Sequence, residues 1–282
     1  MWQRFSIKFL GEASSWLRSC MSDTPSPSQF ARPRTILKIV GVLVLIGGSV
    51  LGYNAFFGTS TTSISYKEAF DQFAVEQGSD VDEIDDGLPL PGVYRYRTTG
   101  GESTKLVASA SREYPAESVI TITRSGCGVR MEWTPVRERT EYLEVCRTDD
   151  RLVLKGYGGA HEFFGMRNEH AVTCADQTWL IPATENGDSA SAVCEGGGLA
   201  HNRTTTSVKT AEVLIGTEKV DGFVVDTKFV SEGSFNGTTV RTMTFDEDGV
   251  LLSWSDVVSG FSPTPVGNAD YEEKFSLTLI PS

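Results

Sequence analysis

The chain has 282 residues, of which 39% are hydrophobic and 22% charged, and its formal net charge is −12 at pH 7. Residues 58–282 hold 35 acids and 19 bases, a charge of −16, whereas residues 1–57 contribute +4. Such an acidic region repels phosphate backbones, which argues against a nucleic-acid partner. At about 225 residues it is also long enough to bury one sizeable core or two smaller ones.

Residues 1–34 are predicted to form a short cytoplasmic tail that is basic and rich in proline and serine. Residues 22–33 include Pro25 and Pro27 between serines, and this stretch is too polar to bury a core. Upstream, four aromatic side chains fall near one face of a helix: Trp2, Phe5, Phe9 and Trp16. Two interpretations stay open: a helix lying on the inner leaflet, or translation that starts at Met21 and omits the first 20 residues.

Residues 35–57 are predicted to form a single membrane-spanning helix. Residues 39–57 carry no charged side chain, and at about 1.5 Å per residue they cover roughly 28 Å, close to the ~30 Å of hydrocarbon in a bilayer. A cleaved signal peptide is the alternative, but no A-x-A-like site and no lipoprotein cysteine follow the apolar core. Gly48 and Gly52 form a G-x-x-x-G pair, through which two copies could form a homodimer.

The charges around the span predict its orientation. Residues 1–38 hold six bases against two acids, and the first base beyond the span is Lys67. The positive-inside rule therefore places the N-terminus in the cytoplasm and the C-terminal region outside. We expect a single-pass protein of the plasma membrane with an extracytoplasmic domain.

Residues 58–92 are predicted to form a juxtamembrane helix followed by an acidic linker. Ser65 and Glu68 fit a capping box for a helix over residues 65–77. Its apolar side chains are expected to share one face and pack on the sheet: Tyr66, Ala69, Phe70 and Phe73. The acids of residues 80–87 could hold calcium, but Ile84 occupies the fifth position, where an EF-hand loop needs an oxygen ligand. A solvated linker is the favoured interpretation.

Residues 93–282 show the period-two pattern of half-buried antiparallel strands. Tyr94 and Tyr96 alternate with arginines, and a later apolar series alternates with polar residues. Three dipeptides favour tight hairpin turns: Asp221-Gly222, Asn236-Gly237 and Asp248-Gly249. No helical segments follow that could make parallel crossovers. The predicted fold is mainly β, a twisted antiparallel sheet that curls into a half-barrel or partly closed barrel, with one short packed helix.

The five cysteines divide by compartment. Cys20 lies on the reducing side and is expected to stay a thiol, whereas the other four lie outside, where disulfides persist. Four cysteines allow three pairings, and the local pattern favours Cys127–Cys146 and Cys174–Cys194, because each pair brackets a hairpin-like segment. Metal binding by these thiols is the rival interpretation, but the chain has no C-x-x-C spacing.

Large aromatic side chains are more numerous than one face of a thin sheet needs. Most are expected to belong to the core. The alternative is a concave apolar pocket for a lipid-like ligand, which a curved sheet can provide. The candidate ligand-binding residues are Tyr94, Tyr96, Trp133 and Trp254.

The three histidines suggest an alternative function, that of a metal-dependent hydrolase. His161-Glu162 and Glu169-His170 flank a predicted hairpin, so the two couples could face each other and bind zinc with His201 as a third ligand. Neither couple has H-E-x-x-H spacing, and interstrand polar pairs are the favoured interpretation. The chain has no G-x-S-x-G motif, P-loop or dinucleotide fingerprint. No catalytic residue, metal ligand or cofactor is therefore assigned.

Two segments carry a resemblance to a known group of proteins. Residues 91–102 and 126–133 read PGVYRYRTTGGE and GCGVRMEW. They resemble uncharacterised single-pass envelope proteins of high-GC Gram-positive bacteria, a resemblance that implies one anchor and a cysteine-bearing, β-rich outer domain but no activity. A fainter likeness is to half-barrels of the periplasmic lipoprotein-carrier type, which implies a cavity for acyl chains. Fold alone does not fix function.

These observations lead to one expected function and two alternatives. We expect a non-enzymatic, membrane-anchored envelope protein whose outer β domain binds an apolar or lipid-like ligand or a cell-surface partner. The alternatives are a metal-dependent extracytoplasmic hydrolase centred on His161 and His170, and a structural or assembly role through the paired glycines.

Overall fold

The computed structural model describes residues 61–77, 87–106, 109–148, 151–163, 166–174, 179–181 and 189–281. The predicted tail and anchor, residues 1–57, lie outside these ranges, and so does most of the acidic linker. Within the described ranges, no helix has both the length and the apolar character that a membrane crossing requires.

The described residues are almost entirely β-structure. One helix, α2, covers Tyr66–Gln77. The strands are β1 Gly92–Lys105, β2 Ser109–Glu113, β3 Glu117–Ser125, β4 Gly128–Val136, β5 Arg139–Thr148, β6 Arg151–Phe163, β7 Met166–Cys174, β8 Trp179–Ile181, β9 Ser189–Gly196, β10 Leu199–Ile215, β11 Glu218–Gly233, β12 Asn236–Phe245, β13 Leu251–Thr264 and β14 Gly267–Leu279.

The strands form one antiparallel sheet that closes into a near-ring. Its order is β14-β13-β12-β11-β10-β9-β7-β6-β5-β4-β3-β1-β2, with β8 beside β6, and β14 pairs back onto β1. The closing ladder runs from Tyr96↔Leu279 to Lys105↔Asp270. On its other side β1 pairs first with β3 and then with β2, so β2 is an edge strand at one end of the near-ring.

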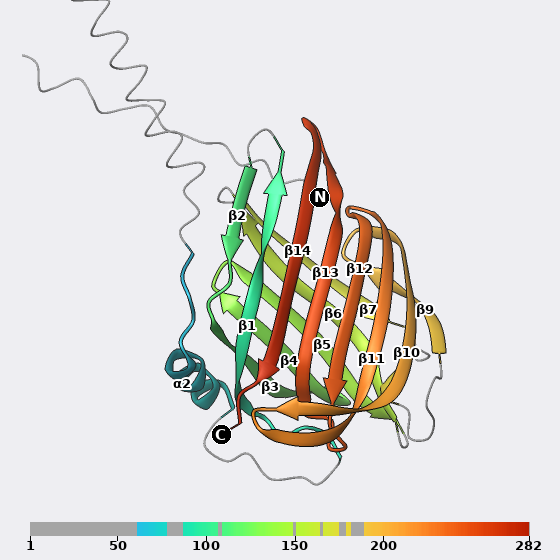
Figure 1. The fold of residues 1–282 in the computed structure, drawn as a ribbon. Coiled ribbons are helices and arrows are strands. Elements are labelled where there is room, and N and C mark those ends of the chain that lie inside the picture. Colours follow the sequence, from blue (N-terminus) through green and yellow to red (C-terminus); the bar gives the residue numbers. More distant parts are fainter. Residues whose placement is uncertain are drawn as a thin grey trace, which may run out of the picture. The chain divides into compact units, whose positions relative to one another are not determined.

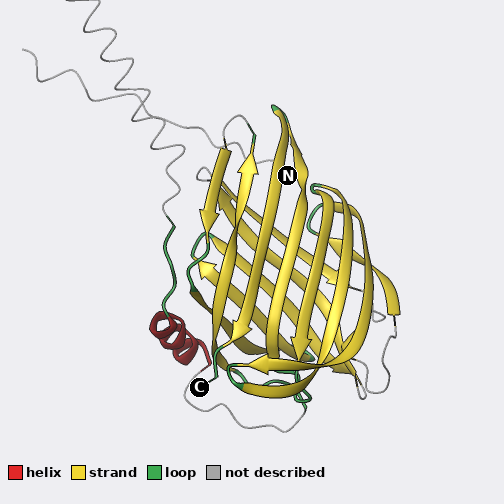
Figure 2. Cartoon of the chain, viewed as in Figure 1, coloured by secondary structure: helices red, strands yellow, loops and turns green. Residues whose placement is uncertain are grey.

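The near-ring is flattened into two layers, with strands of one layer running obliquely across the other. Strands β10 to β14 and β1 make the front layer, and β3 to β7 cross behind it (Figure 1). Figure 2 shows α2 as the single described helix, on the outside of this β-structure. The predicted mainly β, antiparallel fold with one short helix is confirmed.

The helix begins as the sequence predicts but presents a different face. The Ser65 side-chain oxygen accepts the backbone N–H of Glu68 at 3.2 Å, which is the predicted N-cap. Ala69 and Phe73 are buried against the sheet, whereas Tyr66 and Phe70 are exposed. The prediction that all four pack on the sheet is therefore half wrong, because α2 offers the sheet only a narrow apolar stripe.

One of the three predicted turns lies where the sequence puts it. Gly249 has φ of 77° in the tight connection between β12 and β13. Asp221 and Gly222 instead lie inside β11, opposite Glu212 and Ala211 of β10, so that prediction was wrong. Asn236 and Gly237 are paired residues of β12, opposite Phe261 and Gly260 of β13, so that prediction was also wrong: the turn precedes them.

Both predicted disulfides are present. Cys127 is joined to Cys146, and Cys174 to Cys194. The second pair lies in register between β7 and β9, with Cα atoms 4.1 Å apart. This link matters because β7 and β9 share only a short ladder, so the disulfide holds the near-ring closed where its hydrogen bonding is sparse.

Candidate functional site

Charged side chains point into the near-ring from six strands. They are three arginines and four carboxylates, all buried: Arg112, Arg139, Arg241, Glu102, Glu141, Asp256 and Glu273. Residues i and i+2 of a strand share a face, so Asp256 follows buried Trp254, and Glu273 precedes buried Phe275. We call these seven residues the ionic cluster.

Arg241 is the centre of one half of the ionic cluster. Its Nε donates to Asp256 Oδ1 at 3.0 Å, and its Nη2 donates at 2.6 Å to both Asp256 Oδ2 and Glu141 Oε1. Trp254 Nε1 donates to Asp256 Oδ1 at 2.7 Å, and the guanidinium carbon lies 4.8 Å from the Trp254 ring centroid. Burial raises the pKa of Asp256 to about 6, although the Arg241 charge opposes this. Arg241 Nη1 is buried and has no hydrogen-bond partner among the described residues.

Arg139 holds the other half together. It donates to Glu273 through Nε and Nη2, both at 3.1 Å, and to Glu141 through Nη2 at 2.7 Å. The Tyr114 hydroxyl donates to the same Glu273 carboxylate. Burial by itself would raise the pKa of Glu141, but the charges of Arg139 and Arg241 outweigh it and hold that pKa at about 2. Glu141 therefore joins the two halves as a carboxylate shared by two arginines.

The cluster reaches the β2 end of the near-ring through Glu102. Arg112 Nε donates to Glu102 Oε1 at 2.5 Å, and the Tyr271 hydroxyl donates to Glu102 Oε2 at 2.6 Å. His161 Nδ1 lies 2.9 Å from the same Oε2. Burial opposes ionisation, but the hydrogen bond and charge of His161, with Arg139 and Arg112, lower the pKa of Glu102 to about 2. These contacts join β1, β2, β6 and β14 by side chains.

The predicted hairpin around residues 164–165 is present, and its register separates each histidine from the glutamate beside it. Phe163 pairs with Met166, and Gly159 lies opposite His170. The rings of His161 and His170 are stacked inside the near-ring, with their centroids 6.1 Å apart. Because neighbouring residues of a strand point to opposite faces, the glutamate beside each histidine points away from this pair. Burial lowers the pKa of His170 to about 4. Among the described side chains, no group of three or more potential metal ligands occurs. The side chain of His201 lies outside the described ones.

The four candidate ligand-binding residues contribute to the core. Tyr96, Trp133 and Trp254 are 0% exposed. The two tryptophan rings lie 6.0 Å apart, and Tyr96 donates its hydroxyl to the Leu251 carbonyl at 2.7 Å. Tyr94 lies at the margin of the core and donates to the Leu90 carbonyl at 2.8 Å. Ligand binding by these four residues stays a prediction.

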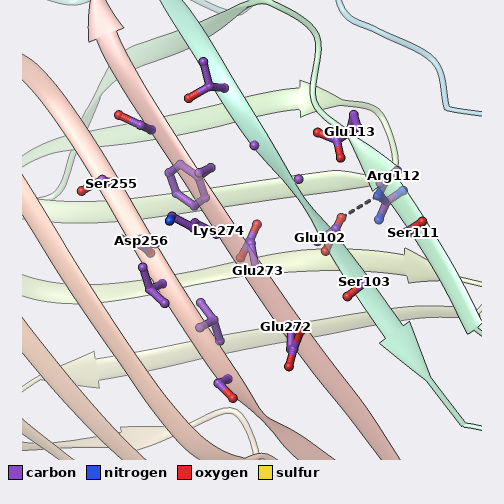
Figure 3. Close-up of a pocket in the computed structure, with 18 residues that line it drawn as sticks. Glu102, Ser103, Ser111, Arg112, Glu113, Ser255, Asp256, Glu272, Glu273 and Lys274 are labelled. Carbon is purple, nitrogen blue, oxygen red and sulfur yellow. Dashed lines mark hydrogen bonds and ion pairs between the residues drawn. The ribbon is translucent and has the colours of Figure 1, made fainter.

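A groove of about 710 Å³ lies over β13, β14, β1 and β2. The strand alternation that turns Glu102, Asp256 and Glu273 inward turns their neighbours to the outside. Figure 3 shows labelled lining residues of all four strands and the ion pair between Glu102 and Arg112. The lining of the groove combines these outward side chains with four residues of the ionic cluster: Glu102, Arg112, Asp256 and Glu273.

The outward side chains of the groove form three rows across the strands. The first row is Ser255, Ser276 and Thr99; the second is Val257, Lys274, Gly101 and Glu113; the third is Ser259, Glu272, Ser103 and Ser111. Two rows are thus rich in hydroxyl groups, and the middle row combines a small apolar floor with charges of both signs. Such a surface can donate and accept many hydrogen bonds at once.

The sequence contains a signal for the ionic cluster beyond the period-two pattern itself. Arg139 and Glu141 are in phase with Leu143, and Arg241 is in phase with Met243. A charged residue in the apolar phase of a strand indicates a buried, paired charge, because an unpaired one is too costly. The identity of the partners could not be read from this signal.

No family model matches the chain, and neither the curated proteins nor the solved structures include a match. The resemblance of residues 91–102 and 126–133 to envelope proteins of high-GC Gram-positive bacteria stays a prediction.

Proposed function

We propose that this is a non-enzymatic, single-pass envelope protein of the plasma membrane whose outer groove binds a hydroxyl-rich glycan of the cell surface. The observation that carries the proposal is the set of three rows on the outer face of β13, β14, β1 and β2. A cell-surface partner is favoured over a lipid-like ligand because three of the four candidate aromatic side chains, Tyr96, Trp133 and Trp254, are fully buried in the core.

The dimensions of the groove suit a short segment of a polymer. Neighbouring strands lie about 4.8 Å apart and alternate residues of a strand about 6.6 Å apart, so four strands and three rows cover roughly 14 Å by 13 Å. A volume of about 710 Å³ falls within the usual range for small-ligand sites, roughly 300–1,000 Å³.

The chemistry of the rows suits a neutral polyol better than an apolar chain. Six hydroxyl side chains line the groove: Thr99, Ser103, Ser111, Ser255, Ser259 and Ser276. Each can donate one hydrogen bond and accept others, which matches the hydroxyls of a sugar. Val257 and Gly101 provide a shallow apolar floor for the C–H face of a ring, and Lys274 and Glu272 add charge-assisted hydrogen bonds.

The ionic cluster supports this role by fixing the strands beneath the groove. Asp256 of β13 is bound to Arg241, and Glu273 of β14 is bound to Arg139. Glu102 of β1 is bound to Arg112 of β2. Each strand of the groove is therefore fixed by an ion pair on its inner face. Because the strands are already fixed, less conformational entropy is lost when a ligand binds the outer face.

The test measures glycan binding to the full chain in nanodiscs by saturation-transfer NMR and calorimetry. The probes are neutral oligosaccharides released from the wall of a high-GC Gram-positive bacterium and, separately, a long-chain fatty acid. Ser276→Trp fills the exposed first row, whereas Thr205→Trp places the same ring on exposed β10 outside the groove. We expect Thr205→Trp to bind oligosaccharide like the unaltered chain and Ser276→Trp to bind at least about tenfold more weakly.

Equal binding by both variants would overturn the groove as the site. Binding of fatty acid but not of oligosaccharide would overturn the glycan and favour the lipid-like ligand. Stoichiometric zinc, measured by elemental analysis after purification without chelator, would instead favour the hydrolase alternative.

A further inference from the structure

A second pocket, of about 230 Å³, lies between α2 and the outer face of β3 and β4. Ile120 and Ile122 of β3 are buried in the core, so the residues that alternate with them point outward, to the side on which α2 packs. Figure 1 shows α2 on the outside of the sheet, near β3. The pocket shares no lining residue with the outer groove. We call it the helix pocket.

One part of the wall of the helix pocket is apolar. Its side chains are Ile64, Ala69, Phe73 and Val119. Ala69, Phe73 and Val119 are buried. At about 3.3 Å per residue, Val119 lies roughly 13 Å along β3 from Thr123, which lines the polar part of the pocket. The apolar part can therefore enclose a short hydrocarbon tail while a polar head group lies at the other end.

The polar part of the wall offers three hydrogen-bond acceptors without a partner among the described side chains. In the ladder of β3 with β4, Thr121 lies opposite Glu132 and Thr123 opposite Arg130. Arg130 donates through Nε and Nη2 to Oε2 of Glu132, at 3.1 and 2.9 Å, which leaves Oε1 of Glu132 unused. The half-buried hydroxyls of Thr121 and Thr123 form no side-chain hydrogen bond within the described ranges. Polar groups in such a place bind water or a ligand.

The charge of the wall favours a cation. Three charged side chains line the helix pocket, Arg130, Glu132 and Glu76, so its formal charge is −1. Arg130 is already engaged, because it also lies 3.6 Å from Glu144 and its guanidinium carbon is 3.5 Å from the Tyr142 ring centroid. An anionic ligand would meet two carboxylates and a cation that is bound elsewhere. An ammonium group has three donors and no acceptor, which matches the three unused acceptors.

We propose that the helix pocket binds a small primary amine, an ammonium group on a short hydrocarbon tail. The ammonium group donates to Oε1 of Glu132 and to the hydroxyls of Thr121 and Thr123, and the tail lies between Phe73 and Val119. At about 30 Å³ for each water-sized group, the 230 Å³ of the pocket holds roughly seven or eight non-hydrogen atoms, which corresponds to an amine of about six carbons. The site is separate from the outer groove, so this inference does not depend on the proposed function.

The test is isothermal titration calorimetry of the full chain in phosphatidylcholine nanodiscs at pH 7, with empty nanodiscs as the blank. The probe is n-hexylamine, and hexanoate and 1-hexanol present the same tail with an anionic or a neutral head. Glu132→Gln removes the carboxylate that lines the pocket. Glu144→Gln is the matched control, because Glu144 also contacts Arg130 and its side chain is similarly exposed, 41% against 37%, but it does not line the pocket. Near-UV circular dichroism checks that each variant is folded.

We expect n-hexylamine to bind the unaltered chain with a dissociation constant of about 1 mM or lower. Glu132→Gln should weaken this binding at least about fivefold and Glu144→Gln by less than about twofold, because a charge outside the pocket acts only through screened solvent. Hexanoate and 1-hexanol should each bind at least about fivefold more weakly than the amine.

Three results would overturn the proposal. Amine binding that does not saturate up to about 10 mM would show that the helix pocket is not a site for it. Equal affinity for the amine and either of the other probes would show that the ammonium group is not recognised. Equal weakening by both substitutions would show that Glu132 does not contact the ligand.

Discussion

Replacing Arg241 by methionine should destabilise the fold by an amount that depends on pH. Methionine has a similar length and fills the space, but it removes the hydrogen bonds to Asp256. Glu141 keeps Arg139 as a partner at 2.7 Å, so Asp256 is the carboxylate left without a cation. An uncompensated buried charge costs about 3–5 kcal/mol.

The magnitude follows from the proton that Asp256 must then bind. Its ordinary pKa is 3.8, and a buried carboxyl without a cation stays protonated at neutral pH. Proton uptake costs about 1.4 kcal/mol for each pH unit above the pKa that it must exceed. In the unaltered chain Asp256 already has a pKa of about 6, so below pH 6 the unaltered chain binds this proton too. The extra loss of stability that proton uptake causes in the variant is therefore about 1.4 kcal/mol at pH 7 and close to zero at pH 5.

The assay is guanidinium unfolding of the full chain in mild detergent at pH 7 and pH 5, with disulfides intact, followed by near-UV circular dichroism. A second variant combines Arg241→Met with Asp256→Asn, which removes the charge but keeps an acceptor for Trp254 Nε1. We expect the double variant to recover at least about half of the loss at pH 7. An equal loss of stability at both pH values in the single variant, with no recovery in the double variant, would show that Asp256 is not the carboxylate left without a cation.

Three further changes test the buried histidine, the second disulfide and the pairing of β1 with β2. Burial lowers the pKa of His170 in the folded chain to about 4, so as the pH falls the unfolded chain binds this proton first and the unaltered chain loses stability. His170→Gln removes this loss, so the variant should gain up to about 3 kcal/mol relative to the unaltered chain as the pH falls from 6.5 to 4. pH-dependent chemical unfolding checks it, and parallel curves would contradict it. Cys174→Ala with Cys194→Ala should lose about 3 kcal/mol, because the disulfide closes a loop with a sequence separation of 20; an unchanged thermal midpoint would argue against its closing role. Gly101→Ala should loosen β2 and raise its amide hydrogen exchange, since a Cβ there would lie 2.2 Å from the Arg112 carbonyl oxygen; unchanged exchange in β2 would show that the strand accommodates the methyl group.

The ionic cluster is better explained by specificity and rigidity than by net stability. Replacing a buried ion pair with apolar residues is often neutral or stabilising, because desolvation offsets the attraction. In this near-ring, however, the cluster joins strands that have no hydrogen bonds with each other: Glu273 of β14 meets Arg139 of β5, and Glu141 of β5 meets Arg241 of β12. A slip of one residue in any of these strands would turn its charge outward and break the set.

Much of the local structure could be predicted from the amino-acid sequence alone, because it depends on neighbours in the chain. The period-two pattern predicted antiparallel strands, Ser65 predicted where α2 begins, and the hairpin-like spacing of the cysteines predicted both disulfides. The face of α2 was predicted only in part. Helical periodicity placed Phe70 with Phe73, but it could not say how narrow a stripe the sheet would cover.

Tertiary structure alone decided how distant strands meet. The pairing of β1 with β14 joins Tyr96 to Leu279, and the salt bridge from Arg241 to Glu141 spans 100 residues. Strand periodicity states whether a side chain faces inward or outward, but it does not state which inward side chain lies opposite. The sequence therefore determined which residues are buried along each strand, and closure of the sheet determined that buried arginines meet buried carboxylates beneath one outer groove.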